Sequence, residues 1–249
     1  MDTLKDKNVV VIGGSRGVGR AIVAAAHASG ARVLAVARRR EFLDALAEEV
    51  PGILTLAADA AHEATATQVR KTLEPDVLVL CGGALPPTAP VHEQTWEEFS
   101  RNWDSDVRAS FLFCREALRQ PLRPGSVVIL VSSGAALGGS PISGGYAAAK
   151  RAQMFLAQYC EGEATRLSLG VRFFAVLPQR IMPDTDLGKI AVAGYARYLG
   201  LTESAFLADM DESQTPDDVA RAVIALAAVP GTGKETAFVV SAHGVEALG

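Results

Sequence analysis

Short apolar runs alternate with longer segments in which apolar residues recur at helical spacing. The runs predict strands at 8–12, 33–37, 53–57, 76–80, 127–131 and 171–177, and the segments between them predict helices at 20–29, 41–50, 63–73, 95–119 and 146–168. Apolar strands between amphipathic helices are typical of a parallel sheet that is covered on both faces. The pattern therefore predicts an α/β fold of the doubly wound type, with residues 1–249 as one domain.

Composition limits the classes of partner. The 249 residues are 49% hydrophobic and 21% charged, which is an ordinary balance for a globular protein. A net charge of −4 and a pI near 5.6 argue against nucleic acid as a partner, because phosphate binding needs a clustered basic surface. The basic run Arg38–Arg40 is short. We expect a small-molecule ligand and no nucleic acid.

The chain also lacks the patterns of membrane and metal proteins. Its charged start, Met1–Lys7, differs from a signal peptide, and it has no apolar segment of membrane-spanning length. We therefore expect a cytoplasmic protein without a membrane partner. Cys81, Cys114 and Cys160 are far apart and odd in number, so the sequence predicts neither a disulfide framework nor a metal site.

A glycine-rich turn follows the first predicted strand. It reads Gly-Gly-Ser-Arg-Gly-Val-Gly over residues 13–19, and a predicted helix begins directly after it. Glycines let a ligand approach the backbone, and the free N–H groups at the start of the helix attract anions. This context predicts a nucleotide phosphate site.

Three residues with acid–base chemistry stand close together in the sequence. Tyr146 follows Ser133 by thirteen positions, and Lys150 follows Tyr146 by four. Positions i and i+4 share one face of a helix, so the Lys150 ammonium can lie beside the Tyr146 phenol and favour its ionised form. The phenol, with an ordinary pKa of about 10, then becomes a usable proton donor or acceptor near neutral pH.

Every one of these features falls at the carboxyl end of a predicted strand, where doubly wound sheets bind their ligands. Residues 13–19 follow the first strand, Arg38 the second, Asp59 the third, residues 81–84 the fourth, Ser133 the fifth and residues 178–184 the sixth. We expect these segments to form one site.

The glycine spacing Gly13-x-x-x-Gly17-x-Gly19, together with Ser133, Tyr146 and Lys150 in a chain of this length, resembles the compact short-chain dehydrogenase/reductase family. The resemblance implies a Rossmann-type sheet of about seven parallel strands, with the segment Lys234–Gly244 supplying the last strand and its tail. It also implies hydride transfer with a nicotinamide cofactor. Ser133 would hydrogen-bond a carbonyl oxygen, Tyr146 would protonate it, and Lys150 would lower the pKa of the tyrosine and bind the nicotinamide ribose.

The end of the second strand indicates the cofactor. Ala37 stands where the family's NAD-type acid would be, Arg38 follows it, and Arg16 in the glycine turn can reach the same place. Arginines there favour the extra phosphate, so we expect NADP(H) in preference to NAD(H). Asp59 resembles the adenine-contacting aspartate and is also a candidate N-cap for the next helix. The expected cofactor contacts are Gly13, Ser15, Arg16, Gly17, Val18, Gly19, Arg38, Asp59, Ala60, Gly82, Tyr146, Lys150 and Ile181.

The chain departs from the family pattern at three places. Leu80 replaces an asparagine whose amide ties neighbouring strands together, and Gln179 and Pro183 replace the glycine and threonine after the sixth strand. Ile181 can still use its backbone for the nicotinamide carboxamide. In the long helix, Asp106 falls where the family places an asparagine that supports the lysine through water.

A shifted register would bring Asn102 to that place, because it lies four residues earlier on the same helical face. The apolar stripe Trp96, Phe99, Trp103, Val107, Phe111 and Cys114 favours Asp106, which we group with Ser133, Tyr146 and Lys150 as a catalytic candidate. An ionised carboxylate accepts but does not donate hydrogen bonds, so the proton relay would be altered. Ser132, which neighbours Ser133, has the alternative role of capping backbone groups.

Residues 184–213 are expected to form a small lid or to pack on the core. The aromatic and apolar residues of this segment suggest an apolar or ring-bearing carbonyl or alcohol substrate, and they are Tyr195, Tyr198, Leu199, Leu201, Phe206 and Met210. An alternative function is a catalytically weak NADP-binding sensor or scaffold. We also expect a homodimer or homotetramer, paired through the two longest helices with contacts from Phe113, Phe155 and Tyr159.

Overall fold

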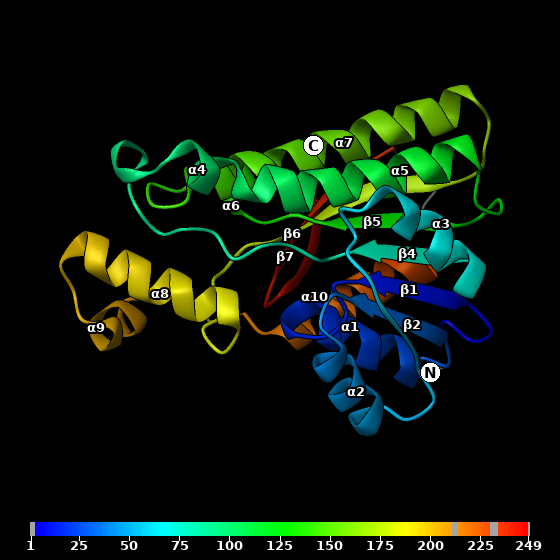
Figure 1. The fold of residues 1–249 in the computed structure, drawn as a ribbon, viewed down its shortest axis with the longest axis horizontal. Coiled ribbons are helices and arrows are strands. Elements are labelled where there is room, and N and C mark those ends of the chain that lie inside the picture. The colour runs from blue at the N-terminus through cyan, green and yellow to red at the C-terminus, as the bar shows by residue number, and fades with distance from the viewer. Residues whose placement is uncertain (1–2, 211–213, 230–233, 249) are drawn as a thin grey trace.

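One sheet organises the chain in the computed structural model, which describes residues 3–210, 214–229 and 234–248 (Figure 1). Its strands are β1 (Asn8–Ile12), β2 (Arg32–Ala37), β3 (Leu54–Ala57), β4 (Val77–Leu80), β5 (Val127–Val131), β6 (Arg172–Pro178), β7 (Ala237–Ser241) and β8 (Gly244–Ala247). The strand order is β3-β2-β1-β4-β5-β6-β7-β8. Strands β1 to β7 run parallel, and β8 pairs antiparallel with β7.

Helices cover both faces of this sheet. They are α1 (Gly17–Ala28), α2 (Arg40–Glu49), α3 (Glu63–Thr72), η1 (Val91–Glu93), α4 (Trp96–Asn102), η2 (Trp103–Val107), α5 (Arg108–Arg119), α6 (Ala135–Gly138), α7 (Gly144–Arg166), α8 (Asp186–Leu199), α9 (Glu203–Ala208) and α10 (Pro216–Ala228). The predicted α/β fold with about seven parallel strands is confirmed. The six strands read from the apolar runs agree with the structure within one residue at each end. Strand β8 was not predicted.

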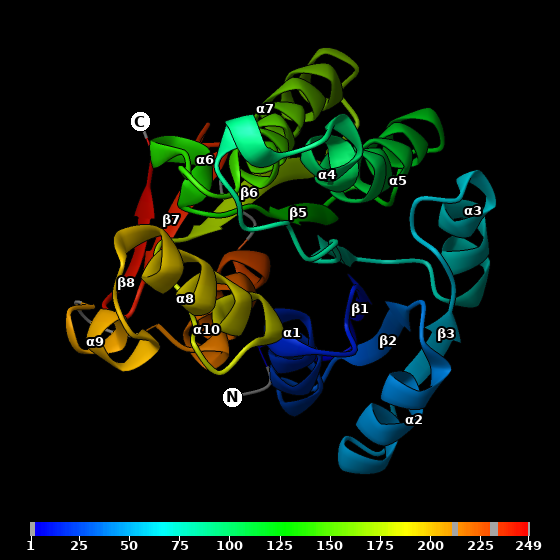
Figure 2. The ribbon, with the colours of Figure 1, turned by 60° about the vertical axis from the view of Figure 1, so that its left-hand side comes forward.

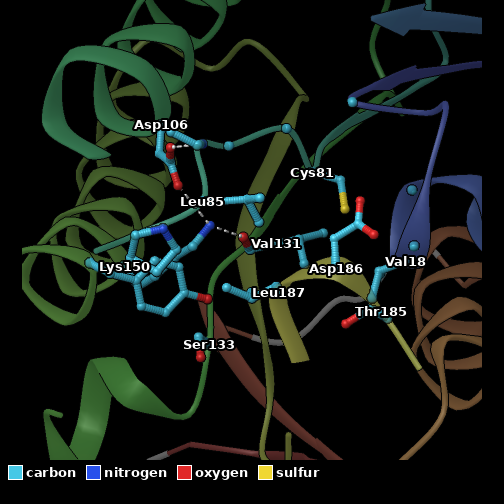
Figure 3. Close-up of a pocket in the computed structure, with 18 of the residues that line it drawn as sticks. Val18, Cys81, Leu85, Asp106, Val131, Ser133, Lys150, Thr185, Asp186 and Leu187 are labelled. Atoms are coloured by element: carbon cyan, nitrogen blue, oxygen red, sulfur yellow. Dashed lines mark hydrogen bonds and ion pairs between the residues drawn. The ribbon is translucent and has the colours of Figure 1, made fainter. Parts of the chain in front are cut away.

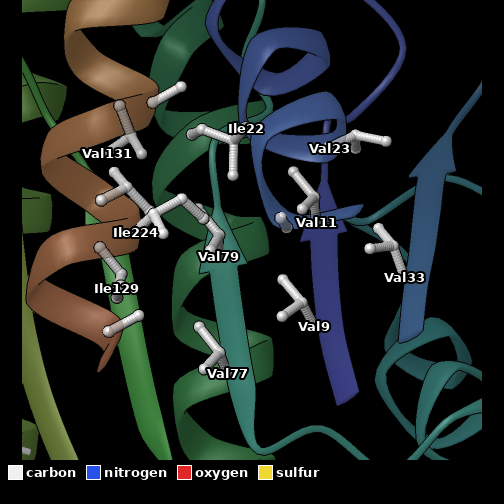
Figure 4. Close-up of a cluster of buried hydrophobic side chains, with 14 of the residues drawn as sticks. Val9, Val11, Ile22, Val23, Val33, Val77, Val79, Ile129, Val131 and Ile224 are labelled. Atoms are coloured by element: carbon white, nitrogen blue, oxygen red, sulfur yellow. The ribbon is translucent and has the colours of Figure 1, made fainter. Parts of the chain in front are cut away.

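The alternation of side chains along β1 explains the two apolar layers. Val9 and Val11 pack with Ile22 of α1 and with Ile224 of α10, and Figure 4 shows these side chains between the strands and the two helices. Val10 and Ile12 point to the other face, where α3, α5 and α7 supply the partners. Burial on both faces explains why residues 9–12 of this strand are all apolar.

The long helix predicted at 95–119 is interrupted. Thr95 caps α4 in a reciprocal capping box with Glu98, but a π-helical turn, η2, separates α4 from α5. A π-turn holds more residues than an α-turn and so rotates the residues that follow it. The residues of the apolar stripe do not form one continuous buried face: Trp96, Trp103 and Phe111 are exposed, whereas Cys114 is buried. Phe113, which we expected at an oligomer contact, is buried in the core instead.

Helices α8 and α9 form the segment predicted as a lid or a core-packed element. They lie together at one end of the molecule, on the opposite side from α2 and α3 (Figures 1 and 2). Tyr195 of α8 stacks on Phe206 of α9 with ring centroids 5.8 Å apart. Tyr198, Leu199 and Leu201 are exposed. Met210 lies two residues after α9, and residues 211–213 of the predicted segment lie outside the described residues.

The described part of the chain contains no helix that is long and apolar enough to cross a membrane. Within the same residues, no group of three or more His, Cys, Asp or Glu side chains is arranged to hold a metal ion.

Candidate active site

A cavity of about 780 Å³ opens where the parallel strands end. The glycine-rich turn after β1, the ends of β2 to β6, and helices α7, α8 and α9 contribute to its walls. The sequence-predicted residues that line it are Gly13, Ser15, Arg16, Gly17, Val18, Gly19, Arg38, Asp59, Ala60, Gly82, Asp106, Ser133, Tyr146, Lys150 and Ile181. The structure thus brings all the predicted site residues to one place.

The glycine-rich turn has the form of an anion cradle. Gly13 has a φ of +80°, and a Cβ atom there would lie 2.4 Å from the Cα of Gly82, so any other residue would collide with the loop after β4. Helix α1 begins at Gly17, no side chain caps its first turn, and that turn carries no acidic residue. Its N–H groups are therefore available to a phosphate, and the residues present fit a dinucleotide.

Arginines gather beside the end of β2. Arg38 is exposed and lines the cavity, as does its neighbour Arg39. The guanidinium of Arg39 lies 4.0 Å from the centre of the Phe42 ring, and that of Arg16 lies 4.8 Å from the same centre. Sequence reasoning missed Arg39 and Phe42. The order Arg38, Arg39, then Phe42 in the first turn of a helix was the available signal.

Asp59 lies at the cavity edge after β3. Its carboxylate accepts a hydrogen bond from the Ala61 backbone N–H at 2.9 Å. The alternative that Asp59 caps the next helix is wrong, because α3 begins four residues later and His62 is its N-cap, accepting from the Ala64 N–H.

The two serines at the end of β5 have different surroundings. The hydroxyl of Ser132 is buried and donates to the backbone carbonyl of Lys150 at 2.7 Å, which is the backbone-capping alternative considered for it. Ser133 lies at the cavity wall, where its Oγ accepts from the Ala135 N–H at 3.2 Å (Figure 3). The Ser132 bond also fixes the turn of α7 that carries Lys150 against β5.

Lys150 is held in a buried ion pair. Its Nζ lies 3.4 Å from Oδ2 of Asp106 and donates to the Val131 carbonyl at 3.1 Å (Figure 3). The two side chains are only 7% and 1% exposed. Burial lowers the pKa of Lys150, but the attraction of Asp106 and smaller contributions from Tyr146 and Cys81 outweigh it, so the pKa is raised above its ordinary value. The lysine therefore carries its charge across the physiological range.

Tyr146 faces the cavity one turn before Lys150, and the Nζ of Lys150 lies 5.5 Å from the centre of its ring. Burial is the largest influence on the phenol and raises its pKa, whereas Lys150 and Ser133 act to lower it. The direction expected for Lys150 is present. Burial outweighs the lysine, so the pKa of Tyr146 is raised overall, contrary to the net lowering expected from Lys150.

Both candidates on the long helix reach this cluster. Oδ1 of Asp106 accepts from the Ala84 N–H at 2.9 Å and from the Ser105 hydroxyl at 2.6 Å. The amide of Asn102 donates to the Ala84 carbonyl at 2.8 Å and lies 3.3 Å from either oxygen of Asp106. Asp106 thus meets the lysine, and Asn102 supports Asp106.

Gly83 makes this approach possible. A Cβ atom at position 83 would lie 2.5 Å from Oδ2 of Asp106, so the carboxylate occupies the space of a side chain. Leu80 stands where the family pattern has an asparagine. Its side chain is buried in the apolar layer under α3, α5 and α7, so it adds to the core.

Cys81, which follows β4, lines the cavity, and burial raises the pKa of its thiol to about 11. It is therefore a neutral wall residue near neutral pH.

The segment after β6 reaches the cavity through Ile181. The Gln179 N–H donates to the Val240 carbonyl at 3.0 Å, which anchors the segment to β7. Thr185, two residues after Pro183, caps α8: its Oγ1 accepts from the Gly188 N–H at 2.9 Å. Thr185 thus both caps α8 and lines the cavity.

The far wall carries hydroxyl groups that sequence reasoning missed. The hydroxyl of Ser143 donates to Oγ of Ser140 at 2.8 Å, and Ser140 shares a 2.8 Å hydrogen bond with the Tyr195 hydroxyl. Ile142 and Thr88 lie beside them on the same wall. Serines in a loop without a motif gave no signal for this role.

Known proteins resemble the chain in sequence and in structure. L-xylulose reductase of Bos taurus is 33% identical over 132 residues, which cover 52% of this chain and 54% of that protein. D-erythrulose reductase of Gallus gallus is 29% identical over 203 residues, 76% of each chain. The chain matches only about half the length of the xylulose reductase.

A solved structure shares the fold. The 3-ketoacyl-(acyl-carrier-protein) reductase of Brucella melitensis, complexed with NADH, superimposes with a TM-score of 0.74 over 90% of this chain and 91% of that chain, at 23% identity. The family model for short chain dehydrogenases matches residues 7–192. With that match over most of its length, this chain belongs to the short chain dehydrogenase family.

Proposed function

We propose that the protein is an NADP(H)-dependent oxidoreductase that transfers a hydride between nicotinamide and a small apolar or ring-bearing carbonyl or alcohol. One observation carries this proposal: Ser133, Tyr146 and Lys150 line the same cavity as the glycine-rich turn. The similarity to L-xylulose reductase and D-erythrulose reductase supports a reductase reaction.

The cofactor would supply the hydride, and the chain would supply position and protons. Ser133 holds the carbonyl oxygen, and Tyr146 gives that oxygen its proton during reduction or takes it back during oxidation. A neutral phenol is the form required for reduction, and the raised pKa of Tyr146 keeps it in that form. The Lys150 charge favours the phenolate that forms when the proton leaves.

Asp106 acts through Lys150 as a positioning residue. Its carboxylate is fixed by the Ala84 N–H and the Ser105 hydroxyl, and it holds the ammonium against the end of β5. In this proposal the direct carboxylate contact takes the place of the family's asparagine and water.

The preference for NADP(H) rests on charge at the end of β2. Arg16, Arg38 and Arg39 line the cavity there, and Ala37 offers no carboxylate to hold a ribose hydroxyl. The planar guanidinium groups suit a phosphate monoester, which they can bind through paired hydrogen bonds.

The substrate would occupy the wall formed by α8, α9, the loop after β4 and the loop before α7. Leu85, Ile142, Ile190 and Phe206 make this wall mainly apolar, which agrees with an apolar or ring-bearing substrate. The Tyr195 hydroxyl and its serine partners provide a polar contact at one place on the wall.

For assembly, we propose a homodimer or homotetramer paired through α5 and α7. Phe111 on α5 and Phe155 and Tyr159 on α7 are exposed, and Phe155 stacks on Tyr159 at 6.1 Å. Exposed aromatic rings on adjacent helices are typical of a surface that another subunit covers.

Replacing Tyr146 with Phe tests the reaction. With a panel of carbonyl compounds and either NADPH or NADH, we expect turnover, followed at the nicotinamide absorbance, to fall by at least about 100-fold. The dissociation constant for NADPH should change little, because the phenyl ring remains. Undiminished turnover in the variant would reject Tyr146 as the acid, and no turnover of any carbonyl by the wild type would favour the sensor alternative.

A further inference from the structure

An ion pair crosses the cavity at the cofactor end. The guanidinium of Arg16, in the glycine-rich turn, contacts the carboxylate of Asp186, in the first turn of α8, although 170 positions separate them in the sequence. The preceding residue, Thr185, lies against the same turn, because a Cβ atom at Gly17 would be 3.8 Å from its methyl group. The start of α8 therefore rests on the phosphate cradle.

The same Arg16 guanidinium also faces the arginines beside β2. It lies 4.8 Å from the centre of the Phe42 ring, and the guanidinium of Arg39 lies 4.0 Å from the same centre. Arg16 is thus within reach both of the carboxylate on α8 and of the place proposed for the 2′-phosphate.

Asp186 differs from the other carboxylates that line the cavity within the described residues. Asp106 is buried against Lys150, and Asp59 is engaged by the Ala61 N–H. Asp186 is 49% exposed and Arg16 is 46% exposed, so water can replace either partner. An exposed ion pair of this kind contributes at most about 1 kcal/mol, whereas a phosphate monoester offers an arginine a second negative charge.

We propose that Asp186 competes with the 2′-phosphate of NADP(H) for Arg16, and so sets how strongly the protein discriminates between NADP(H) and NAD(H). Binding of the phosphate withdraws Arg16 from Asp186 and releases the start of α8 from the glycine-rich turn. NAD(H), with a neutral hydroxyl at that position, leaves the ion pair in place. This inference rests on the proposed NADP(H) preference.

The test is the ratio of two dissociation constants, measured by nicotinamide fluorescence or calorimetry without any substrate. In Asp186→Asn we expect NADPH to bind about 2- to 5-fold more tightly, which lies within the range that an exposed ion pair provides. The dissociation constant for NADH should change by less than about 1.5-fold, because its uncharged 2′-hydroxyl does not attract Arg16 away from Asp186. Asp184→Asn, which removes a neighbouring exposed carboxylate, is the matched control and should leave the ratio unchanged.

Two outcomes would overturn the inference. Weaker binding of both cofactors by Asp186→Asn would mean that the ion pair clamps either cofactor, and an unchanged ratio would mean that no competition occurs. In an Arg16→Ala background the Asp186→Asn effect should vanish. If it persists there, Asp186 repels the phosphate directly, and the competition is rejected.

These results are separable from the proposed cofactor preference. Equal affinity of the wild type for NADPH and NADH would reject that preference. If Asp186→Asn still changes the ratio of the two dissociation constants, and does so only when Arg16 is present, the competition between Asp186 and the phosphate is supported even without that preference.

Discussion

Two ion pairs stand in the same cavity and differ in nearly every physical respect. Lys150 and Asp106 are 7% and 1% exposed, are held by further hydrogen bonds, and lie at the catalytic end. Arg16 and Asp186 are 46% and 49% exposed and join a loop to a helix at the cofactor end. Both pairs link segments that are distant in sequence.

The two ion pairs differ in their access to water and in whether a ligand anion can replace one partner. The buried pair has no access to bulk water, so its charges act on each other and on Tyr146 in a medium that screens them weakly. The exposed pair is screened, and a ligand anion can replace one of its members at small cost. A buried pair therefore suits a fixed proton site, and an exposed pair suits a site that a charged ligand must enter.

The largest effect should come from removing the buried carboxylate. Asp106→Asn leaves the Lys150 ammonium without its counter-charge, and we expect the free energy of unfolding to fall by about 3 kcal/mol in urea titrations at neutral pH. Asp104→Asn, on the same turn but exposed, is the control and should change it by less than about 0.5 kcal/mol. Equal stability of the two variants would show that the buried pair contributes no more than a surface charge.

The pH dependence of this loss follows from the raised pKa of Lys150. A raised folded pKa stabilises the protein fully below the ordinary lysine value of 10.5, and this contribution disappears as pH rises through the folded pKa. Without Asp106, burial lowers the pKa of Lys150, so the stability difference between wild type and Asp106→Asn should be largest near neutral pH and should shrink as pH rises toward and beyond the ordinary lysine value. A difference that grows with alkaline pH would contradict the assignment.

Activity of Asp106→Asn should survive this destabilisation. Asp106 raises the pKa of Tyr146, so its neutralisation lowers that pKa, and the alkaline rise of alcohol oxidation should begin at lower pH than in the wild type. We expect turnover at neutral pH, measured below the unfolding temperature, to be retained or increased. Complete loss would mean that the carboxylate itself is required.

Much of the fold was predictable because burial dictates it. Strands such as β1 and β5 are covered on both faces, so their apolar runs mark them to the residue. Strand β8 is exposed along its length and has no such run. The π-turn η2 was also hidden, since one extra residue in a helical turn leaves no mark in composition, yet it exposes Phe111 and buries Phe113.

The candidate site likewise contains residues that the sequence predicted and contacts that it did not. Residues that belong to motifs, such as Tyr146 and the glycines of the turn after β1, were placed correctly at the cavity because strand ends determine where they meet. Pairings such as Arg16 with Asp186 depend on how α8 docks, which no local pattern encodes. The role of Gly83 likewise became clear only when Asp106 was seen in the space of its missing side chain.

A second arginine, Arg38, tests the cofactor end of the cavity. Arg38→Ala should weaken NADPH binding by about tenfold, or ~1.4 kcal/mol, because one charged partner of the 2′-phosphate is lost. NADH binding should change by less than twofold on the same reasoning, roughly 0.4 kcal/mol. Arg32→Ala, at the opposite end of β2, serves as the control for loss of one positive charge. Equal weakening of both cofactors would reject Arg38 as the phosphate partner.

The smallest effect should be that of the exposed pair on stability. Because Arg16 and Asp186 are both about half exposed, Asp186→Asn should change the free energy of unfolding by less than about 1 kcal/mol, with Asp184→Asn as reference. Raising the salt concentration from about 0.05 to 1 M should remove even that difference, since the screening length falls to about 3 Å. The loss in Asp106→Asn should persist at high salt, because its ion pair lies out of reach of the solvent ions. A salt-resistant loss of several kcal/mol in Asp186→Asn would place the two pairs in the same class, and Arg16 would then be too firmly bound for a cofactor phosphate to displace Asp186.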